Sequence, residues 1–199
     1  MNTNIRQPKQ ERSIETKNKI ILAGYKLFSN VGYYGTNTAE IAKEAGVSTG
    51  IVYGYFRDKR DILISVLDIY IEKVFEPFLK MFDKVSAPFN LKDFIEKVIE
   101  EVIKTHKRNR KMHETLHALS GSDEAVSTEF LRLEDEITIK IADKLPILGI
   151  NNECGVEKVH LAMDIIQSFS HEVVFDKHDY INYDKMKEMV VYTIINLFK

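Results

Sequence analysis

Two histidines and a glutamate in the middle of the chain have the spacing of a helical zinc site. His113, Glu114 and His117 form the pattern His-Glu-x-x-His, which places both imidazoles on one face of a helix and provides a carboxylate as general base. A zinc hydrolase also needs a third ligand and a strand edge to hold its substrate. The sequence indicates no strand, and the spacing does not distinguish Glu134 or Glu136 as a ligand. We therefore expect no catalytic residue, metal or cofactor, and keep a zinc-dependent hydrolase as the alternative function.

A segment near the N-terminus has the residue pattern of a helix-turn-helix. Asn37 and Glu40 form a capping box that begins a short helix, and Gly46 ends it because glycine adopts the left-handed backbone of a sharp turn. Ser48 then caps a second short helix. Two short helices joined in this way can place the N-terminus of the second helix in the major groove of DNA.

The polar side chains of this segment suit a DNA backbone. Ser48 and Thr49 supply hydroxyls at a helix N-terminus, where amide groups and the helix dipole also favour phosphate. Tyr53 and Tyr55 supply phenols that can reach phosphates, and Lys59 supplies a positive charge at the start of the next helix. Core packing is the alternative role for the two tyrosines, and we favour the role in DNA binding.

Residues 35–63, GTNTAEIAKEAGVSTGIVYGYFRDKRDIL, resemble the DNA-binding segment of TetR/AcrR-type transcriptional regulators. The family pattern is roughly a hydroxyl pair followed by I-A-x-x-A-G-V-S-x-G-x-x-Y-x-Y-F-x-x-K-x-x-L. Residues 27–33, LFSNVGY, match the end of the family's first helix. The remainder of the chain resembles the family only in length, helical character and helix order.

The resemblance implies which residues contact DNA. Asn37 and Thr38 would contact phosphate at the start of the second helix, and Lys59 would hold a flanking phosphate. Thr49 and Ile51 would face bases, where an isoleucine can touch a thymine methyl group. The DNA-binding residues that we predict are Asn37, Thr38, Ser48, Thr49, Gly50, Ile51, Tyr53, Gly54, Tyr55 and Lys59.

Gly54 is the main departure from the family pattern, which often has histidine or tyrosine there. The glycine removes one groove contact and costs the helix about 1 kcal/mol relative to alanine. The operator sequence therefore cannot be inferred from the family.

By the same resemblance, the helices after residue 58 enclose a mostly apolar cavity for an unknown small-molecule effector. The helix with the two histidines would lie in this part, so His113, Leu116 and His117 are the effector-binding residues that we predict. A metal-sensing regulator, or plain packing and surface histidines, are the alternatives. An effector that prefers one arrangement of this part would lower the affinity for DNA. The resemblance thus implies a ligand-responsive repressor.

Helical periodicity accounts for nearly the whole chain and predicts an all-α fold of about nine helices. We expect Asp58 and Ser122 to cap the fourth and seventh helices, Pro77 to kink the fourth, and Pro146 to end the seventh. A three-helix head at 1–58 would bind DNA, and 59–199 would form the effector-binding and dimerisation domain. The predicted helices lie at about 13–30, 37–45, 49–56, 58–82, 90–103, 109–119, 122–145, 152–175 and 182–198.

The last two predicted helices, about 152–198, carry apolar stripes that one chain has little left to cover. By resemblance they pair with the same helices of a second copy. A homodimer has the twofold symmetry of a palindromic operator in double-stranded DNA. We therefore expect three partners: operator DNA, a second copy and the effector.

Charge and composition agree with a DNA-binding module on an acidic body. Up to residue 61 there are ten basic and six acidic residues, although the net charge of the chain is −2. Arg6, Lys9 and Arg12 could reach a minor groove, but a solvated tail is the favoured interpretation. One cysteine, no apolar run of about 18 residues and no secretory signal lead us to expect a cytoplasmic protein without a membrane partner.

Overall fold

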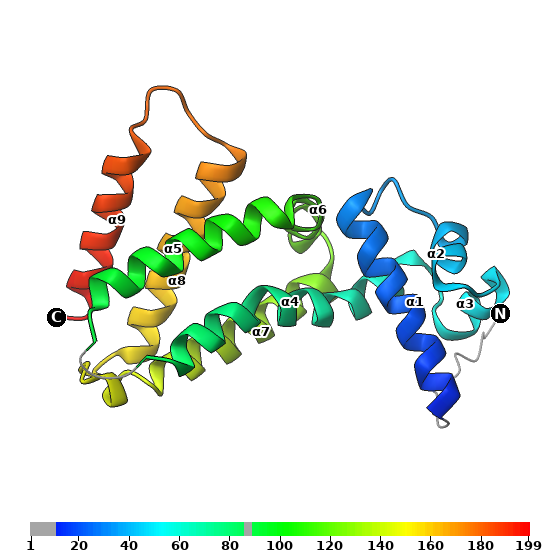
Figure 1. Ribbon diagram of the computed structural model, residues 1–199, viewed down its shortest axis with the longest axis horizontal. Coiled ribbons are helices and arrows are strands. Elements are labelled where there is room, and N and C mark those ends of the chain that lie inside the picture. Colours follow the sequence, from blue (N-terminus) through cyan, green and yellow to red (C-terminus); the bar gives the residue numbers. More distant parts are fainter. Residues whose placement is uncertain (1–10, 86–88) are drawn as a thin grey trace. The chain divides into compact units, whose positions relative to one another are not determined.

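The computed structural model describes the backbone of residues 11–85 and 89–199, with the side chains in these ranges except those at 71–73, 75, 79 and 83. Every regular element in the described ranges is a helix, so the all-α fold class is confirmed. Among them no helix is long and apolar enough to cross a membrane. In chain order (Figure 1) the helices are α1 Glu11–Asn30, α2 Thr38–Ala45, α3 Thr49–Tyr55, α4 Lys59–Asp83, α5 Leu91–Arg108, α6 Arg110–Ser120, α7 Glu124–Ala142, the 3-10 helix η1 Pro146–Leu148, α8 Gly155–Phe175 and α9 Tyr183–Leu197.

The chain forms two compact units. Unit 1 comprises the described part of residues 1–73 and residues 109–130, and unit 2 comprises the described part of residues 74–108 and residues 131–199. α4 and α7 therefore begin in unit 1 and continue into unit 2. The functional division after residue 58 stays a prediction, because these units are defined by packing and not by activity.

Unit 1 is built around α1, which packs against α2 and α6, while α2 packs against α3. A Cβ added to Gly24 would lie only 2.7 Å from the side chain of Ile62, so α1 and α4 approach closely there. The helices of this unit bury apolar side chains at helical spacing. The completely buried ones include Ile20, Phe28, Ile41, Val52, Ile62, Leu63, Val66, Leu67 and Met112.

Unit 2 has α5, α8 and α9 packed against one another, as Figure 1 shows. Their inward faces share one core, formed by Ile95, Ile99 and Val102 of α5, Ala162, Ile166 and Phe169 of α8, and Val190, Val191 and Ile194 of α9. The apolar stripe of α8 was expected to pack against a second copy of the chain. Much of it packs instead against α5 and α9 of the same chain.

The boundaries of α7 differ from the prediction. Its N-cap is Asp123 and not Ser122, because the Asp123 Oδ1 atom accepts hydrogen bonds from the amides of Ala125 and Val126 at 3.1 and 3.3 Å. The helix ends at Ala142, four residues before Pro146, which begins η1 instead. Proline has no N–H to continue a helix, but its fixed φ suits the first position of a new one.

α8 begins later than expected because Cys154 has a φ of 54°, a left-handed conformation that a continuing helix does not allow. The predicted kink at Pro77 stays a prediction, and α4 continues through that residue to its end.

Candidate nucleic-acid interface

The turn between α2 and α3 is held by the local hydrogen bonds that the sequence predicts. Asn37 Oδ1 accepts from the amide of Glu40 at 3.0 Å, and Glu40 Oε2 accepts from the amide of Asn37 at 2.9 Å, which completes the capping box. Gly46 ends α2 with a φ of 69°. Ser48 Oγ then accepts from the amide of Ile51 at 3.3 Å and caps α3. These bonds fix the direction of α3 relative to α2.

α3 has an inward and an outward face. Val52 is completely buried and Phe56, just after the helix, is 3% exposed, so both anchor α3 in unit 1. On the other side Ile51 is 42% exposed and Tyr53 is 52% exposed. Large apolar or aromatic side chains on an outward face of a short helix are available to touch base edges and phosphates.

The remaining predicted contact residues surround this outward face. Ser48 and Gly50 are exposed, whereas Thr38, Thr49 and Gly54 are half-buried. Nothing lies within 4 Å of the position that a Cβ of Gly54 would occupy, so the missing side chain leaves open space on the helix. The contacts themselves stay predictions.

Tyr55 has a structural role that the sequence did not indicate. Its hydroxyl and the Ser13 hydroxyl are 2.8 Å apart and share a hydrogen bond. The bond ties the end of α3 to the start of α1, two segments that are far apart in the sequence. The phenol therefore helps to orient α3, and a contact with phosphate would have to share the same oxygen.

Lys59 is also engaged within the protein. Its ammonium donates to the carbonyl oxygens of Tyr33 and Thr36, each at 2.7 Å, and lies 4.2 Å from the centre of the Tyr33 ring. Desolvation by burial lowers the pKa of Lys59. An ammonium has three N–H groups, so a phosphate contact would use the third. Lys59 thus holds the loop that leads into α2, which sequence reasoning missed because the carbonyl partners carry no side-chain signal.

Of the basic side chains that follow α3, two are held by carboxylates. Arg57 makes a bidentate contact with Asp61, at 2.7 and 2.9 Å. These hydrogen bonds lower the pKa of Asp61. Arg60 makes a bidentate contact with Asp123, at 2.5 and 2.7 Å, which joins the first turn of α4 to the N-cap of α7.

The N-terminal basic residues that could reach a minor groove are Arg6, Lys9 and Arg12. Arg6 and Lys9 lie outside the described residues, and Arg12 is exposed on α1.

Among the residues that the structure describes, no third potential metal ligand lies beside His113 and His117. The rings of His113 and His117 are 6.0 Å apart on α6. In the described part of the chain, the group with three potential ligand atoms within 4.8 Å is a different one, at Glu134, His160 and Asp164. His160 Nδ1 lies 3.9 Å from a carboxylate oxygen of Glu134, and His160 Nε2 lies 3.8 Å from one of Asp164.

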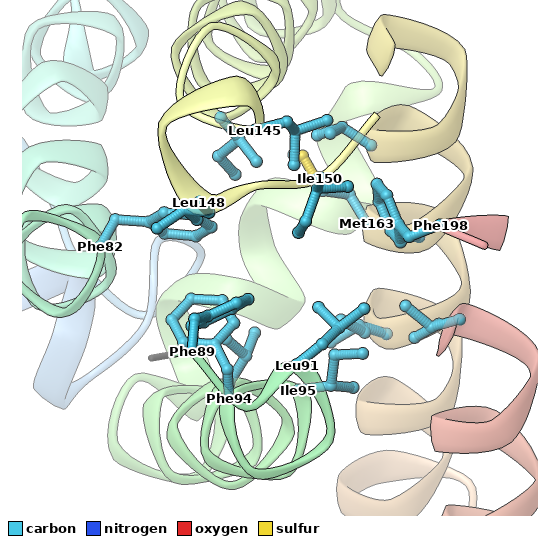
Figure 2. A pocket seen from close by; sticks show the side chains of 16 residues that line it. Phe82, Phe89, Leu91, Phe94, Ile95, Leu145, Leu148, Ile150, Met163 and Phe198 are labelled. Carbon is cyan, nitrogen blue, oxygen red and sulfur yellow. The ribbon is translucent and has the colours of Figure 1, made fainter. Parts of the chain in front are cut away.

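Two adjoining cavities lie inside unit 2. The first has a volume of about 90 Å³ and the second about 80 Å³. Figure 2 shows the first cavity, with Leu145, Leu148 and Ile150 facing Phe89 and Phe94 across it. The two cavities share five lining residues: Phe82, Val98, Ile141, Met163 and Ile166.

The predicted effector residues do not line these two cavities, and their role stays a prediction. Leu116 is 1% exposed in unit 1, His113 is half-buried and His117 is exposed. Their helix, α6, packs against α1. The described cavity walls come from α4, α5, α7, α8 and α9 and from the segments that follow α4, α7 and α9. The signal that could have been noticed is His106, which continues the buried stripe of Ile99 and Val102 on α5.

The capped turn between α2 and α3, with its outward-facing second helix, has the geometry of the helix-turn-helix found in DNA-binding proteins. Residues 20–66 match the family of bacterial regulatory proteins called the tetR family. HbdR, an HTH-type transcriptional regulator from Aromatoleum sp. (strain CIB), is 50% identical over 64 residues, or 30% of this chain and 28% of HbdR. AcrR from Shigella flexneri is 31% identical over 114 residues, or 56% of this chain and 53% of AcrR. The chain thus spans about half or less of the length of these relatives.

The fold similarity extends further than the sequence similarity. The crystal structure of a TetR-family transcriptional regulator from Mesorhizobium loti superimposes with a TM-score of 0.74 and 16% identity, covering 94% of this chain and 97% of that one. Residues 20–66 thus carry a DNA-binding segment of the tetR family, and the fold of the chain is the one found in TetR-family regulators. The relatives that match are named as transcriptional regulators and not as hydrolases, so the similarities favour a regulator over the zinc-hydrolase alternative.

Proposed function

We propose that the protein is a ligand-responsive repressor that binds a palindromic operator as a homodimer and is released by a small-molecule effector. The outward face of α3 carries the DNA-binding part of this proposal. Its two anchors, Val52 and Phe56, and the caps at both ends of the turn hold Ile51 and Tyr53 toward solvent. A pre-ordered face of this kind loses little entropy on binding.

DNA binding is tested with a labelled duplex from the region upstream of the protein's own coding sequence. Fluorescence anisotropy should give an affinity that falls steeply with salt, because phosphate contacts release counterions. Tyr53→Ala should weaken binding about tenfold, which corresponds to about 1.4 kcal/mol. Tyr180→Ala is the matched control, since Tyr180 is an 83% exposed tyrosine of unit 2. Equal loss in both variants, or none in Tyr53→Ala, would refute the assignment.

The homodimer is supported by apolar side chains that remain exposed on the last two helices. Val156 and Leu161 of α8 are 48% and 46% exposed, and Met189 and Tyr192 of α9 are 68% and 66% exposed. Burial of such side chains against a second copy is favourable by about 25 cal/mol per Å² of apolar area. Sedimentation should therefore show a dimer that Met189→Asp weakens while the helical circular dichroism stays unchanged. A monomeric wild type would contradict this part.

The release mechanism is supported by the two helices that the units share. α4 contributes Val74, Phe78 and Phe82 to the cavity walls, and α7 contributes Ile137 and Ile141. Both helices begin in unit 1, where the contact between Arg60 and Asp123 joins the first turn of α4 to the N-cap of α7. An effector that binds one arrangement of α4 and α7 more tightly would favour that arrangement. The DNA-binding parts of the two copies would then be placed differently, and the affinity for the operator would fall.

A further inference from the structure

We propose that the effector is an electrically neutral, mostly apolar molecule of about six to ten non-hydrogen atoms with one hydrogen-bonding group. This inference rests on the proposed function, because it assigns a chemical class to the ligand of the cavities in unit 2.

The first cavity excludes charge. All 16 of its described lining residues are apolar, among them Phe94, Leu145 and Met163 (Figure 2). An ionised carboxylate or ammonium moved from water into such walls loses its hydration without gaining a partner, which is strongly unfavourable. A hydrocarbon chain or ring instead gains from leaving water and from contact with the walls. This cavity therefore accepts the apolar body of a ligand.

The second cavity supplies a polar end without a formal charge. Thr105, His106 and Gln167 lie among its lining residues, and the described lining contains no lysine, arginine, aspartate or glutamate. His106 Nδ1 lies 2.9 Å from the carbonyl oxygen of Val102. Since a carbonyl only accepts, Nδ1 carries the proton and the Nε2 atom of the neutral ring is an acceptor. The hydroxyl, imidazole and amide groups of this lining suit an uncharged hydrogen-bonding group of a ligand, such as a hydroxyl.

The protonation state of His106 agrees with this polarity. Desolvation by burial lowers the pKa of His106, although its hydrogen bond to the Val102 carbonyl oxygen acts in the opposite direction. The ring is 5% exposed and therefore stays uncharged at neutral pH. An anionic head group would thus find no counter-charge in the described lining.

The size of the ligand follows from the volumes. An apolar cavity of about 150 Å³ accommodates a six-carbon ring. The two cavities here, about 90 and 80 Å³, adjoin along five shared side chains. They suit an elongated molecule that extends from one to the other.

Three eight-carbon probes that differ in the head group test the inference on the unmodified full-length protein. Isothermal titration at pH 7.5 with 1-octanol, octanoate and n-octylammonium compares a neutral, an anionic and a cationic head. We expect 1-octanol to bind at least tenfold more tightly than either ion. Equal or tighter binding of octanoate or octylammonium would overturn the neutral assignment, and so would no binding of 1-octanol.

A matched pair of variants shows where the probe binds. Val98 lines both cavities, so Val98→Phe should fill them and reduce 1-octanol binding at least tenfold. Lys97→Phe places the same side chain on the exposed face of α5 and should leave binding unchanged. If both variants bind 1-octanol like the wild type, the alcohol associates elsewhere and the inference is wrong.

The same preparations are assayed for operator binding without any probe. If the protein binds the operator but does not bind 1-octanol, or binds the three probes equally well, only the proposed class of effector is refuted. Absent DNA binding refutes the proposed function, whatever the probes do.

Discussion

The Asp123 side chain connects two helices through two separable interactions, and this makes its contribution measurable. One carboxylate caps α7 at the amides of Ala125 and Val126 and also receives the guanidinium of Arg60 from α4. Replacement by alanine removes both interactions. Replacement by asparagine keeps an oxygen at the cap and removes only the charge, because asparagine is as good an N-cap residue as aspartate.

The expected magnitudes follow from these contacts. Loss of the cap costs about 1 kcal/mol of unfolding free energy. Loss of the ion pair costs less than about 1 kcal/mol, since the Arg60 side chain is 42% exposed and solvent screens the pair. Asp123→Ala should therefore destabilise the protein by about 1.5–2 kcal/mol, and Asp123→Asn by about 0.5–1 kcal/mol.

Urea unfolding followed by circular dichroism measures both variants, alone and in an Arg60→Ala background. In that background the cost of Asp123→Asn should vanish, whereas the additional cost of Asp123→Ala should remain, because the cap does not depend on Arg60. If Asp123→Asn destabilises the protein as much as Asp123→Ala, the hydrogen bonds to the amides of Ala125 and Val126 do not contribute to stability. If Asp123→Asn still destabilises the protein in the Arg60→Ala background, the charge of Asp123 does not act through Arg60. Either result would refute the reasoning.

Three further predictions concern the same unit. Gly54→Ala should raise the unfolding free energy by about 0.5–1 kcal/mol, because alanine favours helix and its Cβ meets nothing within 4 Å; a fall would show a hidden clash. Lys59→Met should speed amide exchange in the loop at Tyr33 and Thr36, whose carbonyls lose their donor, and unchanged exchange measured by mass spectrometry would contradict this. The hydrogen bonds from Arg60 lower the pKa of Asp123 to about 2, so the free energy of unfolding that Asp123 adds over asparagine should persist above pH 4 and disappear as the pH falls from 4 towards 2. The free energies of unfolding of the wild type and Asp123→Asn, measured over this pH range, test the sign. A difference that grows in acid would contradict it.

The capped turn shows how much the sequence alone could predict. Asn37, Glu40, Gly46 and Ser48 act as expected because each bond joins residues at most a few positions apart. Their spacing therefore specifies the geometry wherever the segment is placed. The same holds for the alternation of apolar positions that produces the helices.

The prediction failed where neighbouring residues offered equivalent choices. Ser122 and Asp123 are both good capping residues, and the sequence does not rank them. The structure selects Asp123, whose carboxylate also binds Arg60, 63 residues earlier in the chain. A tertiary partner thus decided a local boundary.

The cavities were beyond sequence analysis for a related reason. The buried stripe that ends in His106 is visible in α5, but a stripe that packs fully and one that leaves a void have the same pattern. A void depends on how side chains such as Phe82, Val98 and Met163, from three helices, fill the shared volume. The sequence by itself determined most of the helices, the caps of the turn between α2 and α3, and the family of the DNA-binding segment, because these depend on residues close together. Only the tertiary structure decided where Lys59 donates, whether Ser122 or Asp123 caps α7, and where the cavities lie, because those depend on distances between residues far apart in the chain.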